Sequence, residues 1–262
     1  MVQKINYSSS QYARHYLYRL YLQCVRPAKF NRFQEQRTRP MPDNHSCVPF
    51  DVHRCIFVHI PKCAGISVSR SLFGNVSGAH HTLKRFQIMF GPREFSEYFK
   101  FSFVRNPWDK LVSAFHFLKK GGLTVSDKKW SDKNLSPYAD FDAFVRNGIQ
   151  RKEIRAFPHF RPQSDFICLS RGKPGVDFLG YFENLEEDFS YVCRRLNVNP
   201  PLLELNRNLS RKKDYRDYYT DETRRIVARF YADDIEMLGY SFDNSTLPAM
   251  LAARRHYDFL DA

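Results

Sequence analysis

The sequence predicts an α/β fold of three layers, in which helices flank a central, mostly parallel sheet. Two short apolar segments lead to this prediction, residues 56–60 (IFVHI) and residues 101–104 (FSFV). Each is rich in β-branched and aromatic residues, as strands buried on both faces are, and each is followed at once by a helical pattern. With 262 residues, 43% of them hydrophobic, the chain is long enough for one full-sized domain of this class.

The first segment leads into a tight turn. Pro61 cannot donate a hydrogen bond to a strand, so the strand should end there. The residues KCAG that follow are a short turn with Gly65 at the position where we expect a backbone angle that other residues resist. From Ile66 the pattern predicts a helix that stops at Gly74. Several backbone N–H groups then face one concave loop at a helix N-terminus, which is an arrangement suited to a phosphate.

This turn is not a Walker A loop. That motif has its lysine directly after the last glycine and a hydroxyl beside it for magnesium. Here Lys62 precedes Gly65 by three positions, and no hydrophobic strand ends in a metal-binding aspartate. An ordinary ATPase or kinase is therefore disfavoured, and a strand–turn–helix without a ligand remains an alternative at this stage.

The second segment leads into another helix start. Asn106 is a good N-cap and Pro107 a good first helical residue, so a helix should begin directly after the strand. Arg105 then lies at the carboxyl end of the strand, where open α/β sheets bind their ligands. Asp109 and Ser113 share one face of the helix at i, i+4 spacing. Arg105 and Ser113 are suited to a second phosphate, and the arginine would bind it through a charge-assisted fork.

Two phosphate sites on two strand–helix turns match 3′-phosphoadenosine 5′-phosphosulfate (PAPS), which carries phosphates on both sides of its ribose. The residues HIPKCAGIS resemble the 5′-phosphosulfate loop of the Golgi-type carbohydrate sulfotransferases and their bacterial relatives, and FVRNPWDKLVSAF resembles their 3′-phosphate motif. Similarity continues at residues 159–163, 181–185 and 214–240, so that the resemblance covers residues 53–243. It implies a P-loop-like fold and a PAPS-dependent O-sulfotransferase of polysaccharide biosynthesis.

The resemblance also implies roles for individual residues. Lys62 would neutralise the leaving phosphate, so no metal is required, and a histidine between the two motifs would be the base. His81 matches that position best because Thr82 and a basic helical stretch follow it, and His80 is the second choice. Cys63 stands where relatives have Thr or Ser, which removes a strong hydroxyl donor. The implied donor-binding residues are Lys62, Cys63, Ala64, Gly65, Ile66, Ser67, Arg105 and Ser113.

The chain is strongly basic. Its 41 Lys and Arg residues against 28 Asp and Glu give a formal net charge of +13, which favours anionic partners without choosing among them. We expect a carbohydrate acceptor, with an acidic glycan favoured by the charge, and no nucleic acid. The six cysteines form no C-x-x-C pair, so a zinc site and a secreted disulfide framework are not indicated. A disulfide between Cys168 and Cys193 is the one pairing that we leave open.

The sequence divides into a basic, aromatic arm with a linker (residues 1–50), a sulfotransferase domain (51–245) and a C-terminal tail (246–262). The arm should contain one helix, with residues 26–50 as linker. No apolar run of about 18–20 residues and no secretory leader is seen, so the sequence predicts a cytoplasmic protein. The basic, aromatic helix is also suited to a peripheral position on an anionic membrane, and packing on the domain is the alternative.

Several further segments carry weaker expectations. Residues 119–139 are polar and Gly- and Lys-rich, which predicts a surface loop; residues 95–100 should form a short helix and residues 165–169 a strand. Residues 158–163 should form a turn whose His, Arg and Gln line the acceptor side. Residues 206–215 form a basic loop suited to closing over the nucleotide. Two other functions remain open: a glycan- or nucleic-acid-binding protein that has the fold without turnover, and a nucleotide kinase.

Overall fold

The computed structural model describes residues 8–40, 46–170, 172–203 and 214–258. The chain divides into two compact units, which are described separately. The first, called the sheet unit, comprises Met1–Ile60, Ala64–Val104 and Phe166–Asn206. The second, called the helical unit, comprises Pro61–Cys63, Arg105–Asp165 and Arg207–Ala262.

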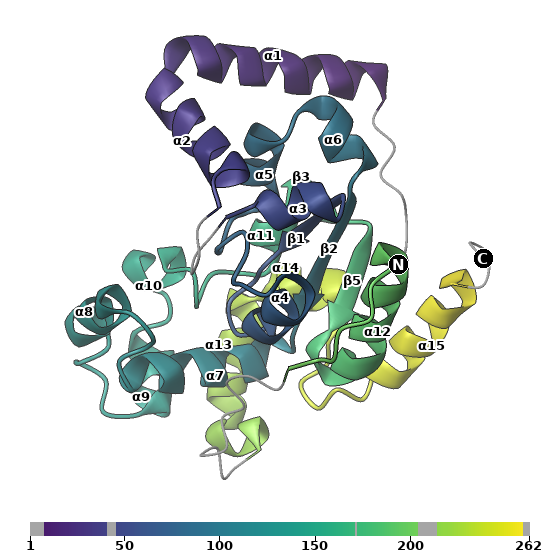
Figure 1. Cartoon of the computed structure of the whole chain (residues 1–262). Helices are drawn as coiled ribbons and strands as arrows, with labels where there is room; N and C mark the ends of the chain where they lie inside the picture. The colour runs from purple at the N-terminus through teal and green to yellow at the C-terminus, as the bar shows by residue number, and fades with distance from the viewer. Residues whose placement is uncertain (1–7, 41–45, 171, 204–213, 259–262) are drawn as a thin grey trace. The chain divides into compact units, whose positions relative to one another are not determined.

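A parallel sheet of three strands forms the centre of the sheet unit (Figure 1). The strands are β1 (Cys55–Val58), β2 (Phe99–Val104) and β5 (Phe178–Tyr181), in the order β1-β2-β5. Phe101 of β2 lies opposite Phe57 of β1 and Phe178 of β5, and all three rings are buried. The sheet has parallel strands and near-continuous apolar runs, so the predicted α/β class is confirmed.

Helices of the same unit flank this sheet. Helix α3 packs against β1, and α12 packs against β5. Helix α4 stops before Gly74, as predicted, and the φ of 72° at Gly74 is typical of a helix C-cap. The elements are α3 (Val48–Val52), α4 (Gly65–Phe73), α5 (Leu83–Met89), α6 (Pro92–Glu97), α12 (Leu185–Leu196), and a short antiparallel pair, β3 (Cys168–Ser170) with β4 (Lys173–Pro174).

A buried ion pair joins β2 to the segment that enters β5. The Lys100 Nζ atom lies 2.9 Å from the Asp177 Oδ2 atom, and both side chains are buried. The Lys100 backbone N–H also donates to that carboxylate, at 2.7 Å. The expected helix over residues 95–100 is therefore wrong at its end: α6 stops at Glu97, because Lys100 is paired inside the sheet.

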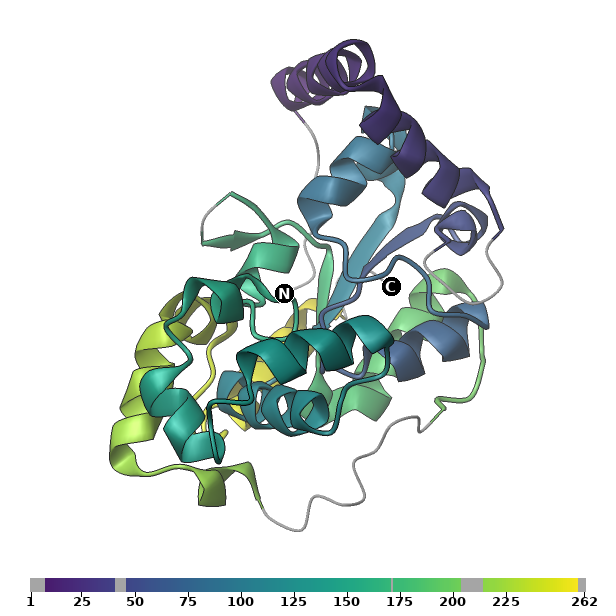
Figure 2. The same cartoon turned by 90° about the vertical axis from the view of Figure 1, so that its left-hand side faces the viewer.

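The N-terminal arm is more ordered than the sequence suggests. Helix α1 (Ser9–Val25) is followed directly by α2 (Pro27–Thr38), so the linker interpretation of residues 26–50 is wrong for this part. Two buried rings, Phe30 and Phe33, lie on α2. Helix α2 packs against α5 and α1 packs against α6, as Figures 1 and 2 both show. The predicted domain boundaries at 50 and 245 themselves stay predictions.

The helical unit is built around an aromatic core. Its helices are α7 (Pro107–Lys119), α8 (Val125–Asn134), α9 (Phe141–Asn147), α10 (Lys152–Ala156), the 3-10 turn η2 (Tyr215–Tyr218), α13 (Asp221–Phe230), α14 (Ala232–Leu238) and α15 (Leu247–Asp258). Phe115, Phe144 and Phe160 lie in its buried cluster. Part of the expected loop over residues 119–139 is helix α8, which begins with a capping box formed by Thr124 and Asp127. The Trp130 ring of α8 stacks on the Phe157 ring, with the ring centroids 3.7 Å apart.

Three smaller expectations are settled by the structure. Residues 164–167 are a helical turn, α11 (Ser164–Ile167), where the sequence suggested a strand, and only Cys168–Ser170 is extended. All six cysteines are free thiols, so the pairing of Cys168 with Cys193 is not formed. Within the described ranges, no helix combines the length and the apolar character needed to cross a membrane. Residues 206–213, most of the expected basic loop over residues 206–215, lie outside the described residues.

Candidate functional site

The candidate site residues fall into two groups, one in each unit. Lys62, Cys63, Arg105 and Ser113 belong to the helical unit. Ala64, Gly65, Ile66, Ser67, His80 and His81 belong to the sheet unit. Each group is described by its own contacts.

The turn after β1 has the strained backbone of a ligand-binding loop, but the strain lies where the sequence does not predict it. Lys62 has a φ of 69° and Ala64 a φ of 59°, whereas the φ of Gly65 is not positive. The expectation of a special backbone angle at Gly65 is therefore wrong. Non-glycine residues with a positive φ are uncommon and cluster at functional sites.

Gly65 is required for a different reason. A Cβ atom placed there would lie 1.8 Å from the Cδ2 atom of His59, well inside van der Waals contact. The His59 ring is buried and packs against the ring of His80, with ring centroids 4.5 Å apart. The absence of a side chain at position 65 thus lets the start of α4 pack closely on His59, which directly follows β1.

Among the candidate site residues of the helical unit, Lys62 is a cation whose pKa is clearly lowered. Its Nζ atom lies 3.9 Å from the centroid of the Phe117 ring, a cation–π contact with α7. Burial, followed by the nearby positive charge of Arg105, lowers the pKa of Lys62 to about 8. Among the described residues, no carboxylate lies within ion-pair distance of Lys62. An anion bound here would relieve both the desolvation and the repulsion.

Arg105 is held in a fixed orientation. Its Nε atom donates to Asp109 Oδ2 at 2.8 Å and its Nη2 atom lies 2.7 Å from the same oxygen. Its Nη1 atom donates to the backbone carbonyl of Lys62 at 3.0 Å. The predicted phosphate-binding arginine is therefore tied to Asp109 and to the turn that carries the predicted catalytic lysine.

Gln163 is the residue that connects this group. Its Oε1 atom accepts from the backbone N–H of Arg105 at 2.9 Å and from the Cys63 thiol at 3.3 Å, and its Nε2 atom donates to the Arg105 carbonyl at 2.8 Å. The Gln163 side chain is fully buried. It therefore fixes the site from within, and the expectation that it lines the acceptor side is wrong.

The segment that carries Gln163 is itself held from two helices. The Asp234 carboxylate of α14 accepts from the backbone N–H groups of Gln163 and Ser164, at 2.7 and 2.8 Å. The buried Lys110 ammonium of α7 donates to the backbone carbonyls of His159 and Arg161, at 3.1 and 2.9 Å. Burial raises the pKa of Asp234 and lowers that of Lys110.

The remaining donor-binding candidates lie on helix starts that the sequence predicts. Asn106 caps α7 by accepting from the backbone N–H groups of Trp108 and Asp109. Ser113 lies two turns along α7 and is half-buried. In the sheet unit, Ala64 precedes α4, Ile66 is half-buried and Ser67 is buried in the first turn of that helix.

His81 uses both ring nitrogens in contacts with its own unit. Its Nδ1 atom lies 2.9 Å from Arg85 Nη1, and its Nε2 atom lies 3.1 Å from Gln36 Oε1. Because a guanidinium can only donate, Nδ1 must accept, so the Nε2–H donates to Gln36. The lone pair that a base needs is therefore already engaged by Arg85.

His80 has the opposite tautomer. Its Nδ1 atom lies 3.2 Å from the backbone carbonyl of His59. Because a carbonyl can only accept, Nδ1 carries the proton and Nε2 carries the lone pair. The ring is half-buried and packs edge-on against His59. The two rings therefore carry their protons on different nitrogens, and the choice of the base between them stays a prediction.

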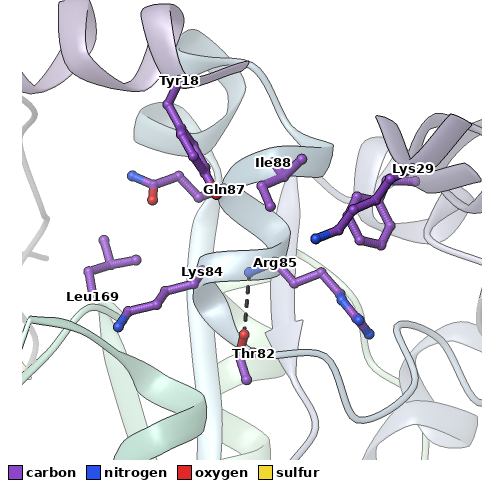
Figure 3. Close-up of a pocket in the computed structure, with 9 residues that line it drawn as sticks. Tyr18, Lys29, Thr82, Lys84, Arg85, Gln87, Ile88 and Leu169 are labelled. Carbon is purple, nitrogen blue, oxygen red and sulfur yellow. Dashed lines mark hydrogen bonds between the residues drawn. The ribbon is translucent and has the colours of Figure 1, made fainter. Parts of the chain in front are cut away.

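A basic pocket lies beside these histidines, in the sheet unit (Figure 3). It has a volume of about 350 Å³ and contains three cations and no carboxylate among its lining residues. Arg85 is preorganised by its bond to His81 and by the Phe33 ring, 5.1 Å from its guanidinium carbon. The lining residues are Tyr18, Lys29, Phe33, Thr82, Lys84, Arg85, Gln87, Ile88 and Leu169.

Comparison with known proteins gives the family. The profile described as the sulfotransferase family matches residues 48–241, about three quarters of the chain. The chain belongs to the sulfotransferase family. The match contains both strand–helix turns and ends just after α14, whereas α1 and α2 precede it.

Two relatives match parts of this chain, and one of them is named as a sulfotransferase. Carbohydrate sulfotransferase 14 of Danio rerio is 25% identical over 234 residues, which is 75% of this chain and 62% of that protein. An uncharacterised protein of Archaeoglobus fulgidus is 32% identical over 126 residues, 48% of this chain and 89% of that protein. The chain thus spans less than two thirds of the carbohydrate sulfotransferase it matches. No solved structure matches significantly.

Sequence reasoning did not identify Phe117 and Gln36, and it gave Gln163 a different role. All three act through contacts with residues far away in the chain, which no local pattern marks. No group of three or more His, Cys, Asp or Glu side chains suited to a metal occurs among the described residues. The expectation of a metal-independent reaction stays a prediction.

The close packing of Gly65 on His59 can be tested by a double-mutant cycle. Gly65→Ala should lower the free energy of unfolding by about 1–3 kcal/mol, because the new methyl group overlaps the imidazole. In the His59→Ala background the same substitution should cost much less. Urea unfolding of the two single variants and the double variant measures this coupling.

Gly74→Ala is the matched control. That position is open space with a φ of 72°, so its cost is backbone strain and should add to that of His59→Ala. Equal coupling of His59 with both glycines would contradict the steric role of Gly65.

Proposed function

We propose that this member of the sulfotransferase family transfers a sulfuryl group from PAPS to a hydroxyl of a carbohydrate acceptor, as a step of polysaccharide synthesis. The observation that carries the proposal is Lys62, a half-buried and desolvated cation next to a second cation, with no carboxylate within ion-pair distance among the described residues. Such a group is costly to keep charged without an anion, and PAPS supplies phosphates.

The donor would be bound through its two ends. Lys62 and the following turn residues, Cys63, Ala64, Gly65, Ile66 and Ser67, are proposed to bind the 5′-phosphosulfate. Arg105 and Ser113 are proposed to bind the 3′-phosphate. The fixed orientation of Arg105 by Asp109 supports this role, because a preorientated guanidinium loses little freedom on binding a phosphate.

In the reaction, the bond between sulfur and the bridging phosphate oxygen breaks as a bond forms between sulfur and the acceptor oxygen. Negative charge develops on the departing 5′-phosphate, and the Lys62 ammonium would stabilise it most in the transition state. The proton of the acceptor hydroxyl would go to a base, for which we propose the His80 Nε2 atom. His81 would then hold Arg85 and Gln36 in place and would not itself take the proton.

We propose an acidic carbohydrate as the acceptor. The basic pocket supports this because Lys29, Lys84 and Arg85 line it without a compensating acid, and Arg85 contacts His81. In Figure 3, Lys84 and Arg85 leave α5 on opposite sides, which suits an extended anion better than a single small one. The volume of about 350 Å³ lies within the range of small-ligand pockets. The Danio rerio relative is named as a carbohydrate sulfotransferase.

The donor assignment is tested by calorimetry with adenosine 3′,5′-bisphosphate, adenosine 5′-phosphate and ATP. The bisphosphate should bind most tightly. Arg105→Glu should weaken binding of both the bisphosphate and adenosine 5′-phosphate, because it also breaks the hydrogen bond to the Lys62 carbonyl. The additional loss for the bisphosphate should be about tenfold to a hundredfold, the effect of a charge-assisted hydrogen bond.

Lys152→Glu, an exposed charge reversal in the same unit, is the control and should change neither affinity. If Arg105→Glu lowers the affinity for the bisphosphate and for adenosine 5′-phosphate by the same factor, the proposed contact with the 3′-phosphate is contradicted. Tight binding of ATP with weak binding of the bisphosphate would favour a nucleotide kinase.

The choice between the histidines is tested by His80→Gln and His81→Gln. His80→Gln should lower kcat for transfer from radiolabelled PAPS to a uronate-containing polysaccharide by about 10²–10⁴-fold, as loss of a general base does. Its affinity for adenosine 3′,5′-bisphosphate should be unchanged. His81→Gln should retain most of kcat. The reverse pattern would assign the base to His81, and no transfer to any polysaccharide by the parent protein would favour a binding protein without turnover.

A further inference from the structure

One face of α1 is apolar and faces away from the protein. Six residues at helical spacing make up this outer face: Tyr16, Leu17, Leu20, Tyr21, Cys24 and Val25. The five of them other than Cys24 are between 44% and 60% exposed, and Cys24 is exposed as well. Isolated exposed apolar side chains are ordinary, but a continuous stripe along a helix indicates a surface that something covers.

The inner face of the same helix is mostly polar, with Leu22 as its buried apolar side chain, which differs from the usual arrangement. Tyr12 hydrogen-bonds to Ser96, and His15 to the backbone carbonyl of Gln87. Arg19 donates to the carbonyls of Ile88 and Phe90, the latter at 3.0 Å. Surface helices normally bury their apolar face against the core. Here α1 is attached by these hydrogen bonds, by the buried Leu22 and by the packing of His15 on Phe95, and its larger apolar face is directed outward.

The charged residues in the segment that carries this face are all basic. Residues 8–34 contain five basic residues and no Asp or Glu. Arg14 is exposed on α1, and Arg26 is exposed between α1 and α2. Figure 1 shows α1 at the edge of the sheet unit, with α2 and α6 on its inner side.

We propose that the outer face of α1 is a docking surface for an anionic lipid membrane. Its leucines and tyrosines would insert at the level of the headgroups and first methylenes, and the basic residues would contact lipid phosphates and carboxylates. Aromatic residues such as tyrosine favour this interface because the ring is apolar and the hydroxyl is polar. The proposal is independent of the sulfuryl-transfer chemistry.

A second copy of the chain is a less suitable occupant. Self-association through α1 would bring together two segments with five cations each and no acid, and the repulsion would oppose it. An anionic surface matches both properties of α1, its apolar stripe and its charge.

The test is flotation of the full-length protein with two kinds of vesicle. Vesicles of phosphatidylcholine with phosphatidylserine should bind the protein, and vesicles of phosphatidylcholine alone should bind it far less. Leu17→Ser/Leu20→Ser should weaken binding to the anionic vesicles by about tenfold or more, because two leucines no longer leave water. Arg14→Gln/Arg26→Gln should weaken it in low salt and have less effect in high salt.

Val52→Ser/Leu123→Ser removes two apolar side chains elsewhere that are more exposed than Leu17 and Leu20, and it should leave vesicle binding unchanged. All these positions are exposed, and circular dichroism checks that each variant is folded. Three results would overturn the proposal: no binding to anionic vesicles, equal binding of the Leu17→Ser/Leu20→Ser variant, or a dimer in light scattering that this variant dissociates. Affinity for adenosine 3′,5′-bisphosphate should be the same in all variants, so a failure here leaves the proposed enzyme function untouched.

Discussion

The buried amide of Gln163 is the constraint on which the helical unit's part of the site depends. It bonds to both backbone groups of Arg105 and to the Cys63 thiol, so it fixes the end of one motif and the turn of the other. Asp234 fixes the Gln163 backbone in turn. A buried amide that satisfies its hydrogen bonds is costly to replace, because removing it would leave the Arg105 N–H without its acceptor in an apolar interior.

This constraint also explains the position of Cys63. In relatives with Thr or Ser at this point, a hydroxyl is expected to serve the phosphosulfate. Here the thiol donates to Gln163 and to the Pro61 carbonyl, both within the protein. A thiol is a weak donor, so little donor strength is lost to the ligand by engaging it in this way. In the proposed donor site, the turn would then rely on backbone N–H groups and on Lys62.

The electrostatics of Lys62 connects the fold to the chemistry. Its ammonium is stabilised by the Phe117 ring, but it is desolvated and close to Arg105. The carboxylate of Asp109 is already used by Arg105. A phosphate dianion would supply what this group lacks, and as charge grows on the leaving phosphate the attraction would grow with it.

Local sequence patterns predicted much of the fold and part of the site. The two strand–helix turns, the Asn106 cap and the Gly74 stop follow from short-range chemistry, and the structure has all three. The linker interpretation failed at α2 because its only buried rings, Phe30 and Phe33, lie in a polar sequence. The sequence marked Gly65 as special because of its backbone angle. In the structure, a side chain at this position is excluded by the His59 ring, six residues earlier. Contacts such as Gln163 with Cys63, 100 residues apart, leave no local signal.

The most direct measurement is the pH dependence of adenosine 3′,5′-bisphosphate binding, by calorimetry in buffers of different ionisation enthalpy. Phosphate groups lose their last proton near pH ~6, so above neutrality the ligand charge is constant. Lys62 with a pKa of about 8 must be protonated to bind the anion, and the bound anion raises this pKa. Binding should therefore take up protons above pH 8, and affinity should fall as the pH rises through this range. Lys62→Arg, which stays charged, should bind without either effect. Affinity that is independent of pH in the parent protein, or proton release on binding, would contradict the role of Lys62.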